Sequence, residues 1–371
     1  MSFVREKDIL LLPQIRYTGK EDLFYQRCRN KVNRYFIDKK KHKLADSRMH
    51  GKTLLLFSLW ILLYMLMLCS GIRGWSLILL QIAWHFNMFL MSVGIAHDGT
   101  HHAYSNKRWV NKFFTGVFDY IGINSDMWEY NHIHSHHRAP NVPVYDSAIF
   151  SLSLFRFHPR APYYRFHRYQ HRYIFIVYAF STLFKLFILD FFSFSRSRIG
   201  FISIQRRPIT QFLYLLFTKA VVITYTLVLP LILIDAPAWQ IVTGFLLGHM
   251  ISGIALGIIF QVTHLHRDTT WPEPDATGNI KTSFAQHILL TTADFCPSSR
   301  VITWISGGLN IHVAHHLFPR ISQMHRVPLA RIIKETAAEC GLSYHYYPTI
   351  LKAIRAHLDT LKMLGREQTA C

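Results

Sequence analysis

The sequence is poor in acidic residues and in cysteine, and both shortages narrow the possible functions. Asp and Glu number 21 against 41 Lys and Arg in 371 residues, a formal charge of +20. Such a surplus is typical of proteins that meet nucleic acid, an anionic membrane surface or an acidic partner. The five cysteines are scattered without a C-x-x-C pair. We therefore expect free thiols, with no disulfide framework and no zinc ribbon.

Charged side chains are almost absent from four long apolar runs. These runs are residues 53–70, 76–97, 213–234 and 240–260, and the third contains a single lysine. Each is long enough to cross a bilayer as a helix, and only short breaks separate the first from the second and the third from the fourth. We therefore predict an all-α integral membrane protein with four transmembrane helices in two hairpins. Pro230 should kink the third helix near its end.

The remaining segments divide the chain into three parts. Residues 1–50 form a basic segment without the early apolar core of a signal peptide, 51–319 the membrane domain, and 320–371 an amphipathic helical part. Two further apolar stretches, 110–123 and 173–192, are interrupted by Lys and Asp. We expect these two stretches to be helices that lie in the membrane interface.

The distribution of Lys and Arg predicts the orientation in the membrane. Basic residues crowd segments 5–52, 107–112, 156–172 and 196–207. By the positive-inside rule, both termini and the 98–212 segment then face the cytoplasm, and we expect the inner membrane of a bacterium. The basic surplus is thus a membrane signal, and we expect no nucleic-acid partner.

Three short stretches are crowded with histidine. They are "AHDGTHHAYS" at 96–105, "NHIHSHHRAPN" at 131–141 and "LNIHVAHHLFP" at 309–319. Each contains a pair spaced i,i+4, namely His97/His101, His132/His136 and His312/His316, with His102, His137 and His315 beside them. Such pairs share a helix face and can hold one metal or reach two adjacent metals. His134, two residues from its neighbours, should point away.

The predicted topology brings these histidines to one side of the membrane. His97 and His264 end the second and fourth spans on the cytoplasmic side, where the other stretches also lie. We therefore predict a cytoplasmic, histidine-rich helical cap. Eight or nine imidazoles exceed the coordination of one ion, which indicates two metals. No thiolate accompanies them and no H-E-x-x-H occurs, so iron that activates O2 on a lipid is the first choice over zinc.

The three stretches "HDGTHHAYSNKRWVN", "WEYNHIHSHHRAPNV" and "GGLNIHVAHHLFP" resemble the histidine boxes of the membrane fatty acid desaturase family. "FQVTHLH", "QHILLTTADF" and "HRYQHRY" resemble connecting stretches of its bacterial linoleoyl-CoA, or front-end, branch. The resemblance covers about residues 90–350. It implies a di-iron, O2-dependent enzyme that removes two hydrogens from an acyl chain.

The resemblance also implies a set of metal ligands. These are His97, His101, His132, His136, His137, His312, His315 and His316, with His264 as a ninth. The Asp98 carboxylate could orient an imidazole by accepting a hydrogen bond from the free N–H of the ring. The alternative role of Asp98 is an ordinary polar contact at the end of the helix. His102 stands where the family usually has Gly and is a possible neighbour of the ligands. Asn141 matches a motif position and is another possible neighbour of the ligands. Asp146 and Gln261 also match motif positions, without an assigned role.

Two departures bear on partners. The third box opens with His312 where front-end enzymes fused to cytochrome b5 often have Gln, and no haem-binding "HPGG" occurs. Electrons should therefore come from a separate donor of the ferredoxin or cytochrome b5 type, docking on the basic face. The substrate is an acyl-CoA or acyl-lipid, whose anionic headgroup could meet Arg138 or the 156–172 stretch. A lipid hydroxylase, a metal transporter and a metal-stabilised scaffold are the alternatives.

Overall fold

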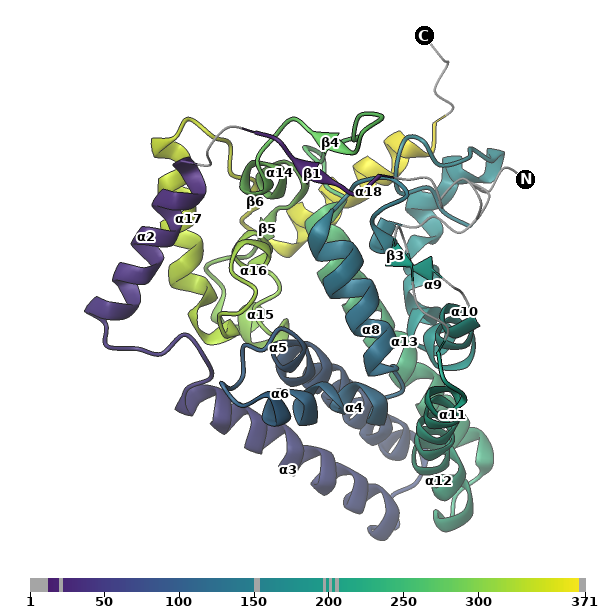
Figure 1. The fold of residues 1–371 in the computed structure, drawn as a ribbon. Helices are drawn as coiled ribbons and strands as arrows, with labels where there is room; N and C mark the ends of the chain where they lie inside the picture. The colour runs from purple at the N-terminus through teal and green to yellow at the C-terminus, as the bar shows by residue number, and fades with distance from the viewer. Residues whose placement is uncertain are drawn as a thin grey trace.

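The computed structural model describes residues 13–19, 23–149, 154–195, 198–199, 202–203 and 207–366. The described part is mostly helical, and its strands form three two-stranded pairs. In Figure 1, the helices α3, α4 and α11 to α12 lie in the lower part of the molecule, whereas α14, α17 and α18 gather above them. The predicted helical membrane architecture is therefore confirmed at this level.

Within the described residues, five helices are long and apolar enough to cross a membrane. Four match the predicted spans, namely α3 (Ser47–Cys69), the run Gly74–Thr100, the run Ile209–Leu233 and α13 (Ala238–His264). The run Gly74–Thr100 begins with α4 (Gly74–Met91). The run Ile209–Leu233 comprises α11 (Ile209–Ile223), η7 (Thr224–Val228) and α12 (Leu229–Leu233). Pro230 lies directly after the π-helical turn η7, where the third span changes its winding.

The fifth such helix is Arg165–Ser195, which contains the 173–192 stretch. It comprises η5 (Arg165–Tyr169), α9 (Gln170–Phe184), η6 (Lys185–Leu189) and α10 (Asp190–Ser195). The charges that interrupt it are paired, because Lys185 Nζ lies 3.0 Å from Asp190 Oδ1. The apolar character of this helix is thus greater than its sequence indicated, and the expected count of four spans is not confirmed.

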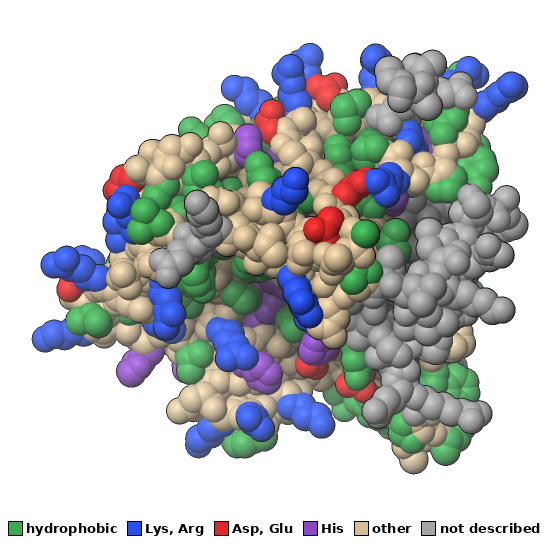
Figure 2. Space-filling model, turned by 45° about the horizontal axis from the view of Figure 1, so that its top comes forward, with side chains coloured by type: hydrophobic (Ala, Val, Ile, Leu, Met, Phe, Trp, Pro, Cys, Tyr) green, Lys and Arg blue, Asp and Glu red, His purple; other side chains and the backbone are tan. Residues whose placement is uncertain are grey.

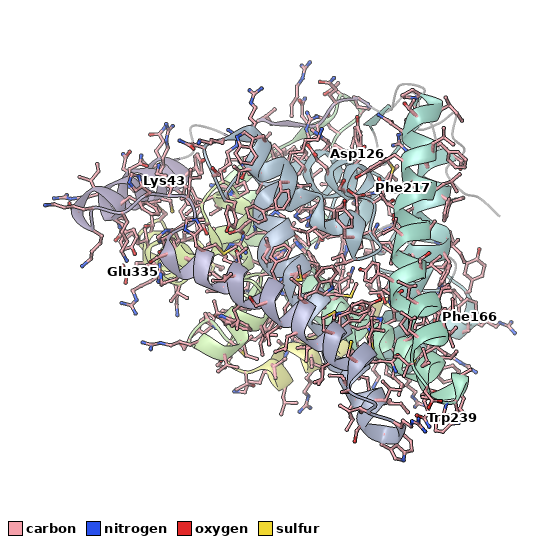
Figure 3. All side chains as sticks on the ribbon, turned by 90° about the horizontal axis from the view of Figure 1, so that it is seen from below. Lys43, Asp126, Phe166, Phe217, Trp239 and Glu335 are labelled. Atoms are coloured by element: carbon pink, nitrogen blue, oxygen red, sulfur yellow. The ribbon has the colours of Figure 1, made fainter. Side chains whose placement is uncertain are left out.

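Helix α4 lies at the centre of the apolar bundle. In the run Gly74–Thr100, which begins with α4, 72% of the most apolar 18-residue stretch is buried, against 22% for that of α3. Helices α4 and α13 approach closely at Gly248, where an added Cβ would lie 2.7 Å from the Cβ of His85. Large apolar side chains on the outer helices are exposed, and Figure 3 shows Phe217 and Trp239 on the side of the molecule away from Lys43. This outer surface suits contact with lipid.

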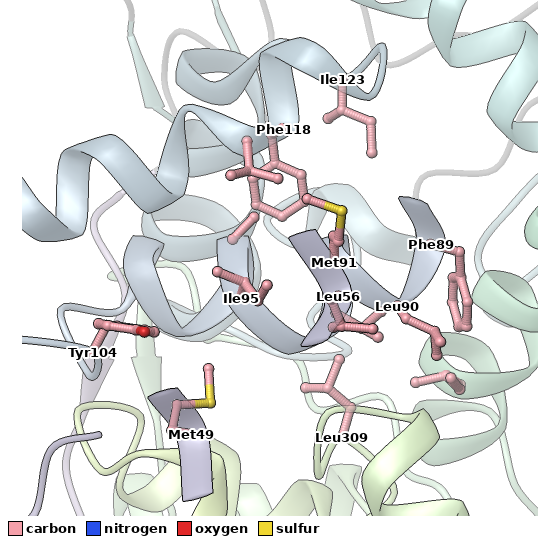
Figure 4. Close-up of a cluster of buried hydrophobic side chains, with 14 of the residues drawn as sticks. Met49, Leu56, Phe89, Leu90, Met91, Ile95, Tyr104, Phe118, Ile123 and Leu309 are labelled. Atoms are coloured by element: carbon pink, nitrogen blue, oxygen red, sulfur yellow. The ribbon is translucent and has the colours of Figure 1, made fainter. Parts of the chain in front are cut away.

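The 110–123 stretch forms two short helices, α6 (Arg108–Thr115) and α7 (Val117–Tyr120). Phe118 of α7 is buried together with Met49 of α3, Phe89 of α4 and Leu309 of the third histidine stretch (Figure 4). This shared core joins the bundle to the histidine-bearing segments.

The upper part of the molecule has its own buried apolar cluster. Helices α2 (Leu23–Asp38), α14 (Phe284–Thr291), α16 (His312–Leu317) and α17 (Arg326–Glu339) all contribute to it. The remaining helical segments are η1 (Ser92–Ala96), α5 (His97–Thr100), α8 (Ser125–Glu129), η2 (Tyr130–Ser135), η3 (His136–Arg138), η4 (Ser147–Ile149), α15 (Arg300–Ile305), η8 (Gln323–His325) and α18 (Ile350–Leu364).

Two of the three strand pairs join segments that are far apart in the sequence. Strand β1 (Arg16–Tyr17) pairs in parallel with β4 (Asn279–Ile280), and β5 (Asp294–Phe295) in parallel with β6 (Tyr346–Tyr347). Strands β2 (Arg198–Ile199) and β3 (Ile202–Ser203) form an antiparallel pair.

Candidate metal centre

The first histidine stretch lies where the second long helix ends. Helix α4 passes through the π-helical η1 into α5, which begins at His97, and His101 caps α5. Both imidazoles are buried. Gly307, at φ +61°, lets the loop before the third stretch pack against η1, because an added Cβ there would lie 2.1 Å from the carbonyl oxygen of Val93.

The second stretch changes its winding within a few residues. The π-helical η2 holds His132, and the 3-10 helix η3 holds His136 and His137; all three are buried. π-helical turns of this kind are frequent at functional sites. His134 is exposed and lies outside the histidine cluster, in the direction that its spacing predicted.

The third stretch forms the short, buried helix α16. Asp294, the first residue of β5, accepts a hydrogen bond from the backbone N–H of Val313 in the first turn of α16 at 3.0 Å. His312, His315 and His316 are buried. Burial raises the pKa of the Asp294 carboxyl to about 6.

Eight of the buried imidazoles form two groups, each of which could hold a metal ion. The first group is His97, His101, His132 and His315, and the second is His136, His264, His312 and His316. Within each group the candidate ligand atoms lie within 4.8 Å of one another. The second and third stretches contribute to both groups, whereas the first stretch contributes to the first group alone.

His137 adjoins the first group. Its Nε2 lies 3.2 Å from Nε2 of His132 and 3.0 Å from Nε2 of His315. Its ring also stacks on that of His316, with centroids 4.3 Å apart. His137 therefore lies between the two groups.

The packing of ring nitrogens in the first group fits metal coordination better than hydrogen bonding. The Nε2 atoms of His97 and His101 both lie 3.0 Å from Nε2 of His132. A neutral imidazole nitrogen can share a hydrogen with only one such neighbour. Several lone pairs directed at one small volume are instead what a cation requires.

In the second group, hydrogen bonds fix the orientation of three rings. Nδ1 of His136 lies 3.0 Å from a carboxylate oxygen of Asp146, and Nδ1 of His264 and His312 face backbone carbonyls at 3.0 and 2.8 Å. A proton on Nδ1 leaves the Nε2 lone pair free for a metal. Among the described residues, Nε2 of His312 has no hydrogen-bond partner.

Burial keeps these imidazoles neutral. Desolvation, reinforced by neighbouring imidazoles, holds the pKa well below its usual value at His101, His132, His137, His312, His315 and His316. Burial opposes ionisation of Asp146, but the His136 ring and the backbone N–H groups of Asn141 and Ala148 hold its pKa below the usual value. The surroundings thus favour the neutral form of these six imidazoles and the ionised form of the Asp146 carboxyl.

The structure places the candidate neighbours of the ligands in different surroundings. Asp98 accepts hydrogen bonds from Ser322 Oγ, the backbone N–H of Gln323 and Arg326 Nη2, at 3.0–3.3 Å, so its carboxylate is occupied by groups other than an imidazole. His102 has a φ of +55°, and its side chain is exposed.

Asn141 and Gln261 make contacts of different strength. Asn141 Nδ2 donates to the carbonyl of His264 at 2.8 Å, and its N–H donates to Asp146 at 2.8 Å, so it links the second stretch to the end of α13. Gln261 Nε2 reaches only the carbonyl of Ala148, at 3.5 Å. The orienting role of Asp146 was not assigned from the sequence, although its motif position was noticed.

A helical membrane protein with two buried groups of histidines able to hold metal is the class that this fold and site define. The family model described as "Fatty acid desaturase" matches residues 73–348. The chain therefore belongs to the fatty acid desaturase family, and it is an oxidoreductase of lipid metabolism that desaturates fatty acyl chains.

Named relatives match almost the whole chain. An acyl-lipid (8-3)-desaturase from Physcomitrium patens is 29% identical over 92% of this chain and 72% of its own length. Two sn-1 linoleoyl-lipid 6-desaturases are each 28% identical. The protein from Synechocystis sp. aligns over 96% of this chain and 99% of its own length, and that from Arthrospira platensis over 94% of each. The resemblance drawn from the three histidine boxes is thus confirmed.

Proposed function

We propose that the two histidine groups hold two iron ions and that the chain uses O2 to place a double bond in an acyl chain carried by a membrane lipid. The first site would be held by His97, His101, His132 and His315, and the second by His136, His264, His312 and His316, with His137 between them. The observation that carries this proposal is the convergence of eight buried imidazoles from four segments on two adjacent points. Iron so held would supply the oxidising chemistry that activates an unreactive methylene.

The acyl chain would approach the first site through a narrow cavity. This cavity, of about 10 Å3, lies beside His97 and is otherwise walled mainly by apolar side chains, among them Phe118, Trp128 and Phe260. It has room for about one water molecule, so the surrounding helices must separate before a chain can enter. Its apolar wall would hold a methylene close to the first site and exclude water.

Trp128 couples the cavity to the ligands. Its ring stacks on that of His132 with centroids 5.0 Å apart. Because the lining offers an acyl chain few polar contacts, the position of the new double bond would follow from how deep the chain reaches. The lipid carrier is inferred from the three relatives described above, which are an acyl-lipid desaturase and two linoleoyl-lipid desaturases.

The exposed arginines near the start of the fifth apolar helix are candidates for contact with a lipid headgroup. Arg156 is not among them, because it is buried and donates to the carbonyls of Ala161 and Leu364 at 2.8 Å. Arg165, Arg168 and Arg172 line the first turns of the helical run Arg165–Ser195, and Arg168 and Arg172 lie over the exposed ring of Tyr169. Arginine beside exposed aromatic rings is typical of a membrane interface.

The positions of His97 and His264 in the two neighbouring histidine groups favour four crossings rather than five. His264 ends α13, and the run Ile209–Leu233 leads into α13 through a short turn, so Ile209 begins on the histidine side. His97 also lies on that side, and between these points the described residues include a single long apolar helix, Arg165–Ser195. One helix cannot cross and return. We therefore infer that it packs beside α13 without a net crossing and that both termini face the cytoplasm.

Fatty acid profiling tests the proposed function. The chain is expressed in a bacterium fed with linoleate, and lipid extracts are compared by mass spectrometry with those of His136→Ala cells. We expect a new polyunsaturated acid with the parent chain and none with the variant, together with two iron ions per purified parent chain. Hydroxy acids without a new alkene would instead identify a hydroxylase, and active protein without bound iron would overturn the metal assignment.

A further inference from the structure

A polar hollow of about 480 Å3 lies outside the two histidine groups. Its wall includes Arg108 of α6, Arg320, the exposed His102 and the buried Asn111, with Leu44 as an apolar member. Among the described residues, none that lines the hollow is acidic. A hollow lined in this way is suited to negatively charged groups.

The hollow adjoins the metal centre through the chain itself. His102 directly follows His101 of the first group, and Arg320 comes four residues after His316 of the second. His102 holds a φ of +55°, which is uncommon for a residue other than glycine. Its backbone N–H donates to the carbonyl of Gly99 at 3.0 Å, and this turn places His102 in the wall of the hollow while His101 stays buried.

A run of basic residues borders the hollow. Residues 39–43, "KKKHK", are four lysines and a histidine, and all are exposed. Two backbone hydrogen bonds fix the chain from Lys43 to Ala45. The N–H of Ser322 donates to the carbonyl of Lys43 at 2.9 Å, and the N–H of Ala45 donates to the carbonyl of Tyr104 at 3.3 Å. The basic run therefore lies beside the C-terminal ends of the first and third histidine stretches.

Helix α6 separates the hollow from the apolar surface. Arg108 and Asn111, spaced i,i+3, face the hollow, whereas Trp109 and Phe113, spaced i,i+4, are exposed outside it. The two rings suit the membrane, and the polar stripe then faces water. Figure 2 shows Lys and Arg side chains around a hollowed region of the surface in which histidine side chains are visible.

We infer that this hollow and the basic run beside it dock the acidic surface of a one-electron carrier protein. The inference rests on the proposed function. One turnover balances as R–CH2–CH2–R′ + O2 + 2 e− + 2 H+ → R–CH=CH–R′ + 2 H2O, so the carrier must deliver two electrons in successive encounters. Charge complementarity of this kind sets encounter rate and partner orientation, and docking here places the carrier beside a neighbour of a metal ligand.

The experiment measures binding and electron delivery separately. Full-length protein in nanodiscs of phosphatidylcholine is compared with Arg108→Glu/Arg320→Glu, using soluble [2Fe–2S] ferredoxin and, in a second arm, the soluble domain of cytochrome b5 as acidic probes. We expect the variant to raise the Kd of at least one probe about tenfold or more and to flatten its dependence on salt. Single-turnover desaturation driven by dithionite should stay unchanged, because neither arginine touches a histidine group.

Arg300→Glu/Arg355→Glu is the matched control, since both arginines are exposed and lie outside the hollow. The inference is overturned if this control weakens carrier binding as much as the hollow variant, or if neither variant weakens it. Binding of added phosphatidylglycerol that the hollow variant alone abolishes, with carrier binding intact, would assign the hollow to a lipid headgroup and also overturn it. A parent chain that makes no double bond even with dithionite would refute the proposed function instead.

Discussion

Asp146→Asn should remove one of the two proposed metal ions and leave the other. The Asp146 carboxylate faces Nδ1 of His136 at 3.0 and 3.1 Å and accepts from the N–H groups of Asn141 and Ala148, both at 2.8 Å. Every partner is a donor. An asparagine brings an NH2 group into the same position, so at least one donor would face another donor.

The expected magnitude follows from the loss of the carboxylate behind a metal ligand. Removing such a partner lowers metal affinity about 10- to 100-fold, which is about 1.4–2.7 kcal/mol. The loss should fall on the second group, because His136 belongs to it, whereas no member of the first group contacts Asp146 in the described residues. The first site should therefore keep its ion.

Iron per chain is measured by mass spectrometry after dialysis against a competing chelator, with Mössbauer spectra to count distinct sites. We expect the content to fall from two ions towards one. Asp119→Asn is the matched control: Asp119 is equally buried, but its partners are Ser125 and Tyr214. Retention of both ions by Asp146→Asn, with unchanged release rates, would refute the reasoning.

Three further outcomes follow from the structure. His132→Ala should lower iron content while His134→Ala leaves it unchanged, since His132 is buried in the first group and His134 is exposed; equal losses would contradict this. Arg326→Met should lower the free energy of unfolding by about 3–5 kcal/mol, because it leaves Asp98 buried without its cation; thermal denaturation measures the loss, and an unchanged Tm would contradict it. The metal-free protein should lose stability as the pH falls below about 6.5. The histidines of the unfolded chain then bind protons, whereas the buried imidazoles of the folded chain, whose pKa is lowered, do not. A Tm that stays constant from pH 7 to pH 5 would contradict this.

The sequence predicted the structure most reliably where a single type of residue indicated a single structural feature. Long runs without charge predicted the four helices that coincide with α3, α4, α11 to α12 and α13. The same reasoning was less reliable for the helical run Arg165–Ser195, because it treated each charge as isolated. Asp190 lies between Lys185 and Lys219, whose Nζ atoms are 3.0 and 2.6 Å away. Lys219 comes from α11, so this pairing depends on tertiary structure.

The spacing of the histidines predicted that they meet, but it could not predict how they divide. Three i,i+4 pairs appear equivalent in the sequence, and the structure treats them differently. His97 and His101 belong to one group, whereas His132 and His136 belong to two. The difference lies in the backbone, since a π-helical segment and a 3-10 segment meet between the latter two residues.

That local winding also explains why Asp146 was not recognised as the partner of His136. Asp146 lies ten positions after His136 along a mostly irregular segment, and Asn141 within that segment has a φ of +59°. No periodic pattern relates two side chains across such a segment. Both ends are nevertheless fixed, because the N–H of Asn141 binds Asp146 and its side chain binds the carbonyl of His264. Asn141 thus joins His264, at the end of α13, to the carboxylate that orients His136 of η3. The second group is therefore a product of tertiary packing that spacing alone does not encode.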